Sequence, residues 1–337
     1  MNPFREVRCP PSLQDLLDRA FRRAFSPRDF SGDRTTRARL REIARLGCFR
    51  DVIVDTLRAV VRSFPSIDDL HPFYRDLADL VVGVDELKHS LGAVDWAAGK
   101  VDDVVREAIR SIRRASSFSK MERLRRAAMG RASSILRRVE GEIEALSRAC
   151  VELRRLPSLD PGLPSVVVAG SPNTGKSTIV RSISSGRPEV APYPFTTKGV
   201  LIGHSYLGAL GRIQVVDTPG LLDRPLSERN EIELQAVLAL KHLADVILFV
   251  SDPTETCGYP LESQLRILRE VREEFSRVPL IVVANKSDMG SLFRRNLPRV
   301  IEVAEAIEAP LVVTSAIRGW GLPELLSVLE EVAGGGR

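Results

Sequence analysis

The chain has 337 residues, of which 44% are hydrophobic and 28% are charged. That length suits two domains of ordinary size, and the charged fraction is typical of a globular protein rather than a disordered or fibrous one. No apolar run reaches the roughly 18–20 residues that a transmembrane helix needs, and neither a secretory signal nor a lipidation motif appears at the termini. We therefore expect a cytoplasmic protein that is not attached to a membrane. We also expect it to be a monomer.

Cysteine and histidine give no sign of a metal site. The four cysteines, Cys9, Cys48, Cys150 and Cys257, include no closely spaced pair, so we expect buried free thiols in a reducing cytosol. The four histidines likewise lack the spacing of metal ligands.

The first half of the chain has the apolar periodicity of helices. Over 13–25 apolar residues recur at a period near 3.6, and Ser12 precedes them as a candidate N-cap. A second helix is expected over 36–62, and Ser66 with Asp69 resembles the capping signal of a third.

A long helical hairpin follows in the same half. Apolar residues alternate by threes and fours over 87–112 and again over 121–153, with a break at Ser116, Ser117 and Ser119. Two such helices joined by a short turn should pack antiparallel. We therefore predict an all-α helical-bundle domain at 1–156.

Positive charge is concentrated in this half. Residues 1–160 carry 31 Lys and Arg against 24 Asp and Glu, and 19–50 hold ten arginines against three acids. Solvated helix faces are one interpretation, and an anionic partner such as RNA is the other. The block that we favour as an RNA contact holds one acid and the bases Arg113, Arg114, Lys120, Arg123, Arg125, Arg126, Arg131, Arg137 and Arg138.

The second half of the chain has a different pattern of apolar residues. Residues 157–163 break the periodicity and are the expected linker. Short apolar runs then alternate with helical segments through 164–337, which indicates an α/β domain with a mostly parallel, doubly wound sheet. Residues 200–216 could form an antiparallel hairpin at the sheet edge. The expected buried strands are 166–168, 214–216, 246–250, 280–283 and 311–313.

A phosphate-binding loop follows the first of these strands. Residues 170–177 read Gly-Ser-Pro-Asn-Thr-Gly-Lys-Ser, and glycines there let backbone N–H groups point at phosphates. Lys176 would neutralise the β- and γ-phosphates, and Ser177 would offer its hydroxyl to Mg²⁺. The residues expected to hold the nucleotide here are Asn173, Thr174, Gly175, Lys176, Ser177 and Thr178.

Three further motifs follow later strands. Asp217 could hold Mg²⁺ through water, and the N–H of Gly220 could meet the γ-phosphate. Asp288, in Asn285-Lys286-Ser287-Asp288, could accept two hydrogen bonds from guanine, whereas adenine would leave this carboxylate unpaired. Backbone N–H groups near Ser315 and Ala316 could contact the guanine oxygen. Because each motif ends a predicted parallel strand, together they predict one GTP site.

A switch threonine is expected between the first two motifs, in Tyr-Pro-Phe-Thr-Thr-Lys-Gly at 193–199. It would bind Mg²⁺ and the γ-phosphate only in the triphosphate state. By position alone, either Thr196 or Thr197 could serve.

Several segments around these motifs resemble a known family. The segment 193–199, Gly203-His204 and 217–225 are similar to the Obg-related GTPases, and most of all to the nucleolar GTP-binding protein (NOG) family in its short archaeal form. Further matches to that family are 156–161, 228–230, 233–236 and 252–258.

The resemblance implies more than the motifs do. It implies that Thr197 is the switch residue that binds Mg²⁺, and that the chain acts as a GTPase in assembling the large ribosomal subunit, with ribosomal RNA as partner. Lys176, Thr197 and Gly220 would then be the catalytic residues. The eukaryotic relatives carry a long C-terminal extension, which we expect to be missing because this chain ends at 334–337.

Two positions bear on catalysis. Many GTPases place a glutamine directly after Asp-x-x-Gly to orient the attacking water, and here that position is Leu221, so we expect slow intrinsic turnover. Asn173 resembles the asparagine of GTPases that recruit K⁺ beside the phosphates, although it could equally be a loop cap.

Two alternatives remain, and the first is of another class. One is an RNA-binding scaffold that GTP merely stabilises, whose ribosome affinity would ignore the nucleotide. The other is a GTPase of the tRNA-modification type, which predicts a cofactor or reactive-cysteine region that we do not find.

Overall fold

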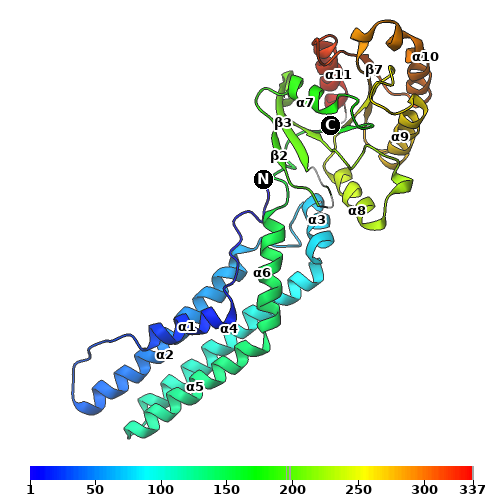
Figure 1. The fold of residues 1–337 in the computed structure, drawn as a ribbon. Helices are drawn as coiled ribbons and strands as arrows, with labels where there is room; N and C mark the ends of the chain where they lie inside the picture. Colours follow the sequence, from blue (N-terminus) through cyan, green and yellow to red (C-terminus); the bar gives the residue numbers. More distant parts are fainter. Residues whose placement is uncertain (195, 197–198, 336–337) are drawn as a thin grey trace. The chain divides into compact units, whose positions relative to one another are not determined.

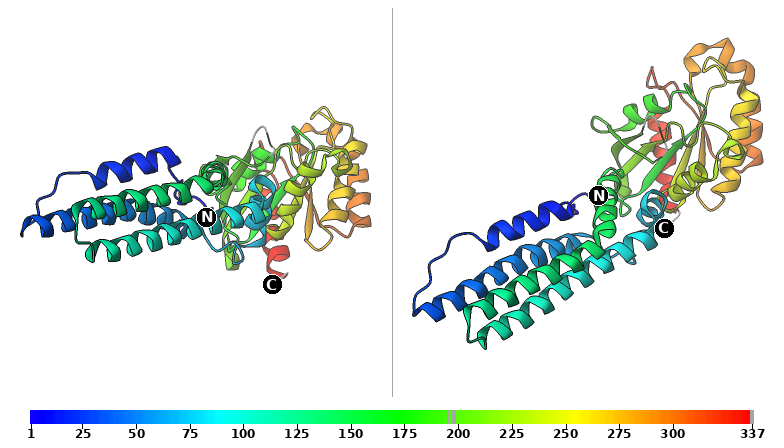
Figure 2. Two further views of the ribbon diagram at one scale, coloured as in Figure 1. Left: turned by 90° about the horizontal axis from the view of Figure 1, so that it is seen from below. Right: turned by 60° about the horizontal axis from the view of Figure 1, so that its bottom comes forward.

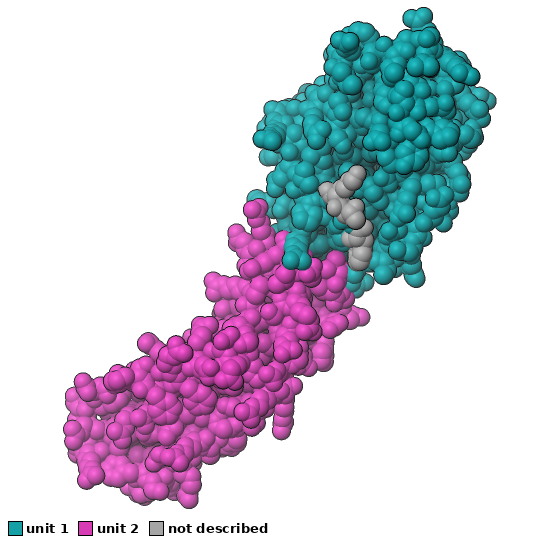
Figure 3. Space-filling view, viewed as in Figure 1, with its two compact units in different colours: residues 1–2, 71–80, 155–337 teal, residues 3–70, 81–154 magenta. Residues whose placement is uncertain are grey.

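The computed structural model describes residues 1–194, 196 and 199–335. They form two compact units, each described by itself below (Figure 3). The helical unit comprises Pro3–Leu70 and Val81–Arg154, and the sheet unit comprises Met1–Asn2, His71–Leu80 and the chain from Arg155 onward.

The segment His71–Leu80 belongs to the sheet unit although it lies far before the linker in sequence. The hydroxyl of Tyr74 explains this placement: it lies 2.6 Å from the carbonyl oxygen of Leu159 and accepts the N–H of the same residue at 2.9 Å. Tyr74 is buried, and burial raises the pKa of its hydroxyl. The domain limits that we predicted are simpler than this division, which interleaves the two units along the chain.

The helical unit contains long helices, as the periodicity predicted. α2 and α4 lie side by side and α5 packs along both (Figures 1 and 2). Ser12 caps α1 by accepting the N–H of Asp15, and Ser117 caps α5 by accepting that of Lys120. The helices are α1 (Leu13–Ala24), α2 (Arg34–Ser63), α4 (Val84–Arg113), α5 (Phe118–Arg138) and α6 (Glu140–Arg154).

Two helix predictions were wrong in detail. The second arm of the hairpin is not continuous, because the backbone of Val139 leaves helical geometry and α6 starts at Glu140. Ser66 does not cap the third helix, α3 (Pro72–Val82). Pro72 instead opens that helix, a position where its missing N–H leaves no bond unmade.

One arginine of the favoured RNA block lies inside the bundle. Arg125 is 6% exposed and its Nε lies 2.5 Å from Oε2 of Glu42, which is 5% exposed. The guanidinium also lies 5.1 Å from the ring centre of Phe25. Arg125 is therefore a structural residue, and its assignment as an RNA contact was wrong; its position in the apolar stripe of α5 explains the burial. The other eight bases of the block are exposed.

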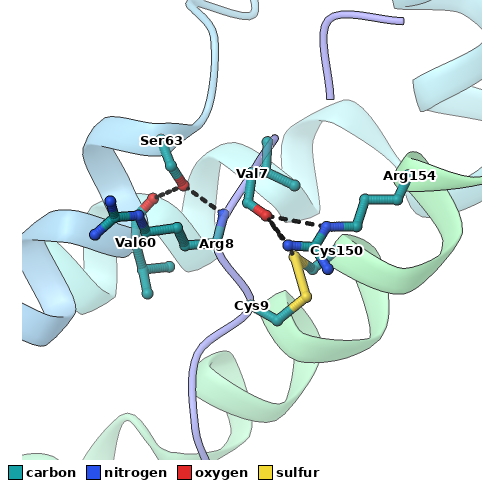
Figure 4. The surroundings of a disulfide bond; sticks show 7 residues. All are labelled: Val7, Arg8, Cys9, Val60, Ser63, Cys150 and Arg154. Carbon is teal, nitrogen blue, oxygen red and sulfur yellow. Dashed lines mark hydrogen bonds between the residues drawn. A yellow bond between two sulfur atoms is a disulfide. The ribbon is translucent and has the colours of Figure 1, made fainter. Parts of the chain in front are cut away.

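The expectation of four free thiols was also wrong. Cys9 and Cys150 form a disulfide across 141 residues, with their Cα atoms 5.5 Å apart (Figure 4). Two hydrogen bonds hold the N-terminal segment beside this pair. Arg154 of α6 donates from Nε to the carbonyl of Val7 at 3.0 Å, and Arg8 donates its N–H to Ser63, at the end of α2, at 2.8 Å. Cys48 and Cys257 are free thiols, and Cys48 is only half-buried. Separation in sequence hid the pair, and the argument for a reducing compartment loses this support.

The sheet unit is built on a sheet whose described strands follow the order β2-β3-β4-β1-β5-β6-β7. β1 pairs in parallel with β4 and β5, and Val167 stands between Val216 and Ile247. The mostly parallel α/β sheet preceded by a helical domain is thus confirmed. The strands are β1 (Ser165–Ala169), β2 (Glu189–Ala191), β3 (Val200–Leu207), β4 (Gly211–Asp217), β5 (Val246–Ser251), β6 (Leu280–Ala284) and β7 (Leu311–Val313).

Helices cover both faces of this sheet. Alternate strand residues such as Val168 and Leu248 share one core with Ile179 and Leu325, which lie in α7 and α11. α9 and α10 contact β5 and β6. The helices are α7 (Lys176–Ile183), α8 (Glu231–Ala239), α9 (Leu261–Glu274), α10 (Ser291–Ala306) and α11 (Leu322–Gly335), with short 3₁₀ turns at Gly208–Leu210, Leu226–Glu228, Leu240–His242 and Ser287–Met289.

The predicted hairpin at 200–216 exists as the antiparallel pair β3 and β4. It is not the sheet edge, because the short strand β2 pairs with β3 on its outer side. β2 was missed since its three residues carry almost no pattern. Across the described ranges, no helix is both long and apolar enough to cross a membrane.

We predict that Arg125→Met destabilises the helical unit by about 3 kcal/mol, because it leaves the carboxylate of Glu42 buried without its closest cation. Glu42 keeps a second partner, Nη1 of Arg45 at 2.7 Å, which should hold the loss near that value. Urea unfolding followed by circular dichroism measures the change.

The matched control is Arg126→Met, one position along the same helix. Arg126 is exposed and its ion pair with Glu122 lies at the surface, so we expect a change within about 0.5 kcal/mol. Equal losses for the two variants would contradict a core role for Arg125.

Candidate nucleotide-binding site

The predicted motifs meet at one edge of the sheet. β1 stands between β4, which follows it on one side, and β5, which follows on the other, so the strand order reverses at β1. The loop after β1 therefore emerges at the switch point where open α/β sheets bind ligands. The loops after β4, β5, β6 and β7 leave the same edge, since all five strands are parallel.

The phosphate loop has the backbone that its glycines permit. Gly170 and Gly175 have φ of 129° and 102°, which other residues rarely adopt. Their lack of a side chain matters as much: a Cβ on Gly170 would lie 2.2 Å from the carbonyl oxygen of Val250, and one on Gly175 would lie 2.2 Å from Nδ2 of Asn285. The loop is thus packed against β5 and against the loop after β6 as well as curved.

Side chains inside the loop hold its shape. Lys176 is 6% exposed, and its Nζ donates to the carbonyls of Gly170 and Ser171 at 2.7 Å each. The hydroxyl of Thr174 donates to the carbonyl of Ser171 at 3.0 Å. Of the residues predicted to hold the nucleotide, Thr174 thus has its side chain engaged within the loop, whereas Ser177 and Thr178 lie in the first turn of α7.

Asp217 and Ser177 meet as predicted for a divalent cation site. The Ser177 hydroxyl lies 2.5 Å from Oδ2 of Asp217, whose side chain is fully buried. Oδ1 of Asp217 has no hydrogen-bond partner within the described part of the chain. Burial raises the pKa of Asp217 although Ser177 and Lys176 act against the rise. A buried carboxylate with an unmatched oxygen beside a hydroxyl fits Mg²⁺, which prefers such hard oxygen ligands.

Asn285 joins three of the loops. Its Nδ2 donates to the carbonyl of Thr174 at 2.9 Å, and its Oδ1 accepts from Thr314 at 3.1 Å and from the N–H of Ala316 at 3.0 Å. The predicted ligand Asn285 is thus a scaffold for the phosphate loop and for the loop after β7.

Asp288 stands where the base would be recognised. Its Oδ1 accepts the hydroxyl of Ser315 at 2.6 Å, and its side chain is otherwise exposed. Ser315 therefore orients the carboxylate through its side chain, a role that differs from the backbone contact that we expected. Lys286 precedes Asp288 with a left-handed backbone, φ 67°.

The loop after β5 contributes residues to which we had assigned no role. Asp252 is fully buried and accepts Nζ of Lys286 at 2.7 Å and the N–H of Cys257 at 2.8 Å. Burial would raise the pKa of Asp252, but these hydrogen bonds outweigh it and hold the pKa below its usual value. Nδ2 of Asn173 lies 3.5 Å from the carbonyl of Cys257, which brings this loop to the phosphate loop. Asp252 directly follows a buried parallel strand, a signal that could have identified it.

The switch residues are covered only in part. Thr197 lies outside the described residues, so its predicted role is not examined by the structure. Thr196 donates its hydroxyl to the carbonyl of Tyr193 at 2.9 Å. Gly220, the predicted γ-phosphate contact, donates its N–H to Oδ2 of Asp223 at 2.8 Å.

Comparison with known proteins shows the family to which the chain belongs. Residues 4–160 match the family model described as the NOG1 N-terminal helical domain, and 231–288 match that of nucleolar GTP-binding protein 1. An uncharacterized protein of Methanocaldococcus jannaschii is 39% identical over 86% of this chain and 81% of its own length. A nucleolar GTP-binding protein 1 of Caenorhabditis elegans is 34% identical over 96% of this chain and 48% of its own length.

A solved structure from Plasmodium falciparum, assigned to nucleolar GTP-binding protein 1, has 29% identity and a TM-score of 0.46 over 53% of this chain and 91% of its own. This chain spans less than half the length of the nucleolar relatives from animals and fungi that it matches. Both family models give the same assignment, and so does the nucleolar relative whose match extends over 96% of this chain. The chain belongs to the nucleolar GTP-binding protein 1 family of GTP-binding proteins.

Proposed function

We propose that this chain binds GTP with Mg²⁺, hydrolyses it slowly, and thereby controls its own residence on precursors of the large ribosomal subunit. The main observation in favour of guanine nucleotide binding is the position of the Asp288 carboxylate. Ser315 orients this carboxylate at the same sheet edge as the phosphate loop. A carboxylate there matches the two N–H donors of guanine and repels the acceptor edge of adenine. The subunit as partner rests on the family resemblance, and a cytoplasmic location stays a prediction.

The side chains suggest how hydrolysis would proceed. Lys176 lies inside the phosphate loop, where an ammonium neutralises charge that develops on the β- and γ-phosphates. Ser177 and Asp217 would hold the metal, and Thr197 would complete that set. A bound Mg²⁺ would help to neutralise the negative charge of the phosphates. Gly220 would hold the γ-phosphate through its N–H.

The water-orienting position explains why the reaction should be slow. Leu221 is 1% exposed, so an apolar, buried side chain stands where other GTPases place glutamine. Asn173 lies at the tip of the phosphate loop with φ 61°, and its side-chain oxygen is the kind of neutral ligand that K⁺ takes. A monovalent cation there would supply part of the charge that an arginine finger gives in other GTPases.

The helical unit has a surface suited to RNA. The two basic blocks of the sequence come together where Arg34 of α2 lies 5.7 Å from the ring centre of Phe118, the first residue of α5. Around them a groove of about 560 Å³ is lined by Arg28, Asp29, Phe30, Arg34, Arg37, Ala38, Arg41 and Phe118. Arginines bind phosphates and exposed aromatic rings stack on unpaired bases, so this groove and the exposed bases of α5 favour a structured RNA.

The guanine assignment predicts that Asp288→Ala lowers affinity for GDP by about 100-fold or more, since the base loses its paired acceptor. Titration of a fluorescent GDP analogue measures this. Glu302→Ala removes an exposed acid from α10 and should leave affinity unchanged. Undiminished GDP binding by Asp288→Ala would refute the proposed base site.

Single-turnover hydrolysis without partners should run on the order of 10⁻⁴–10⁻² per second. If Asn173 recruits K⁺, the rate in KCl should exceed that in NaCl at matched ionic strength, and Asn173→Ala should abolish the difference. A rate far above this range would contradict the role of Leu221, and equal rates in the two salts would remove K⁺ from the mechanism.

For RNA, Arg123→Glu combined with Arg131→Glu should weaken co-sedimentation with large ribosomal subunits and flatten its salt dependence by about one unit of slope per lost phosphate contact. Arg294→Glu with Arg295→Glu makes the same charge change on exposed residues of α10 and should not. Binding is compared with GDP and with a non-hydrolysable GTP analogue. Stronger binding with the analogue supports the switch, indifference to nucleotide supports a scaffold, and no binding removes the subunit as partner.

A further inference from the structure

The turn after β4 is held by its own side chains on both sides of Gly220. The N–H of Gly220 donates to Oδ2 of Asp223 at 2.8 Å, and its carbonyl accepts from Nη1 of Arg229 at 2.9 Å. Asp223 and Arg229 thus hold the residue whose N–H the proposed function assigns to the γ-phosphate.

Arg229 is unusual among the charged residues of the turn. Its side chain is fully buried, and Nη2 lies 3.5 Å from Oδ1 of Asp223. Within the described residues, Nε and Nη2 have no hydrogen-bond partner. Buried guanidinium N–H groups without acceptors are costly. The Nε and Nη2 groups of Arg229 are therefore able to donate further hydrogen bonds. They lie next to the carboxylate of Asp223, which accepts the N–H of Gly220.

One N–H cannot donate fully to two anions. When a γ-phosphate takes the N–H of Gly220, Asp223 must leave it, and a carboxylate that stayed would also repel the phosphate. The nearest group able to receive the displaced carboxylate is the guanidinium of Arg229. GDP has no γ-phosphate and leaves the contact between Asp223 and Gly220 intact.

We propose that Asp223 and Arg229 form a latch that sets the preference of this protein between GTP and GDP. Asp223 competes with the γ-phosphate for the N–H of Gly220, and Arg229 is the positioning residue that receives Asp223 when the triphosphate binds. This inference rests on the proposed GTP-binding function and goes beyond it, since it names two residues that determine nucleotide preference.

The latch is also connected to the helix that follows. Arg229 directly precedes Asn230, which caps α8 in a reciprocal arrangement with Glu233. Glu233 in turn accepts Nη2 of Arg224 at 2.8 Å. A change in the partner of Asp223 therefore occurs one residue before a helix start that is itself fixed by hydrogen bonds, so the exchange can be passed on to α8.

The test measures dissociation constants for GDP and for a non-hydrolysable GTP analogue in the full chain with Mg²⁺. Asp223→Ala should raise affinity for the analogue about tenfold, the worth of one charge-assisted hydrogen bond, and leave GDP affinity within twofold. Glu228→Ala removes an exposed acid from the same segment and should change neither. An unchanged or reduced ratio of analogue to GDP affinity in Asp223→Ala overturns the latch.

A second variant distinguishes a role of Arg229 in the latch from a purely structural role. Arg229→Gln should lower affinity for the analogue more than for GDP, because Asp223 loses its receiver. In an Asp223→Ala background the same substitution should leave the ratio unchanged, since no carboxylate remains to be received. An equal effect of Arg229→Gln in both backgrounds would assign it a structural role only. Failure of every protein to bind any guanine nucleotide would instead refute the proposed function.

Discussion

The side-chain amide of Asn285 is the contact on which the nucleotide site depends. It joins the loop after β6 to Thr174 in the phosphate loop and to Thr314 and Ala316 after β7. A buried amide with both ends satisfied fixes the loops in one arrangement, and any replacement would leave backbone groups of two loops without partners. Gly175 is required by the same contact, because a Cβ there would lie 2.2 Å from the amide nitrogen.

Asp252 extends this framework to the loop after β5. It draws Lys286 and the backbone of Cys257 together, and Cys257 in turn meets Asn173 at the tip of the phosphate loop. The loops after β1, β5, β6 and β7 are thus cross-linked by hydrogen bonds. The turn after β4 is anchored as well, by the Thr218 hydroxyl on the carbonyl of Val168 and by the N–H of Gly170 on the carbonyl of Leu222. Gly220 itself, however, is held by Asp223 and Arg229 of the same turn. Rigidity at the base and exchange at the γ-phosphate are the two properties that a nucleotide switch needs.

The sheet and the nucleotide motifs could be predicted because parallel strands buried on both faces are continuous apolar runs, and their loops necessarily share one edge. Pairings that sequence order does not carry could not. Cys9 and Cys150 are 141 residues apart, and Arg125 differs from its exposed neighbours only by standing in the apolar stripe of α5. Ser315 was expected to act through its backbone, and only the structure shows its hydroxyl on Asp288. Short-range patterns identify elements, but the partner of each polar side chain depends on packing.

In the turn after β4, ligand binding is an exchange rather than an addition. The hydroxyl of Ser177 bonds to Asp217, and the N–H of Gly220 bonds to Asp223. Under the proposed function, a metal at the first pair and a γ-phosphate at the second would each compete with a bond within the protein. A ligand shifts a two-state equilibrium only by the difference in its affinity for the two states. Under the proposed function, GTP would therefore favour the state in which Gly220 has left Asp223 only to the extent that the γ-phosphate binds this N–H more strongly than Asp223 does. GDP has no γ-phosphate to compete for the N–H of Gly220, so with GDP the equilibrium between the two states would depend on the protein's own contacts alone.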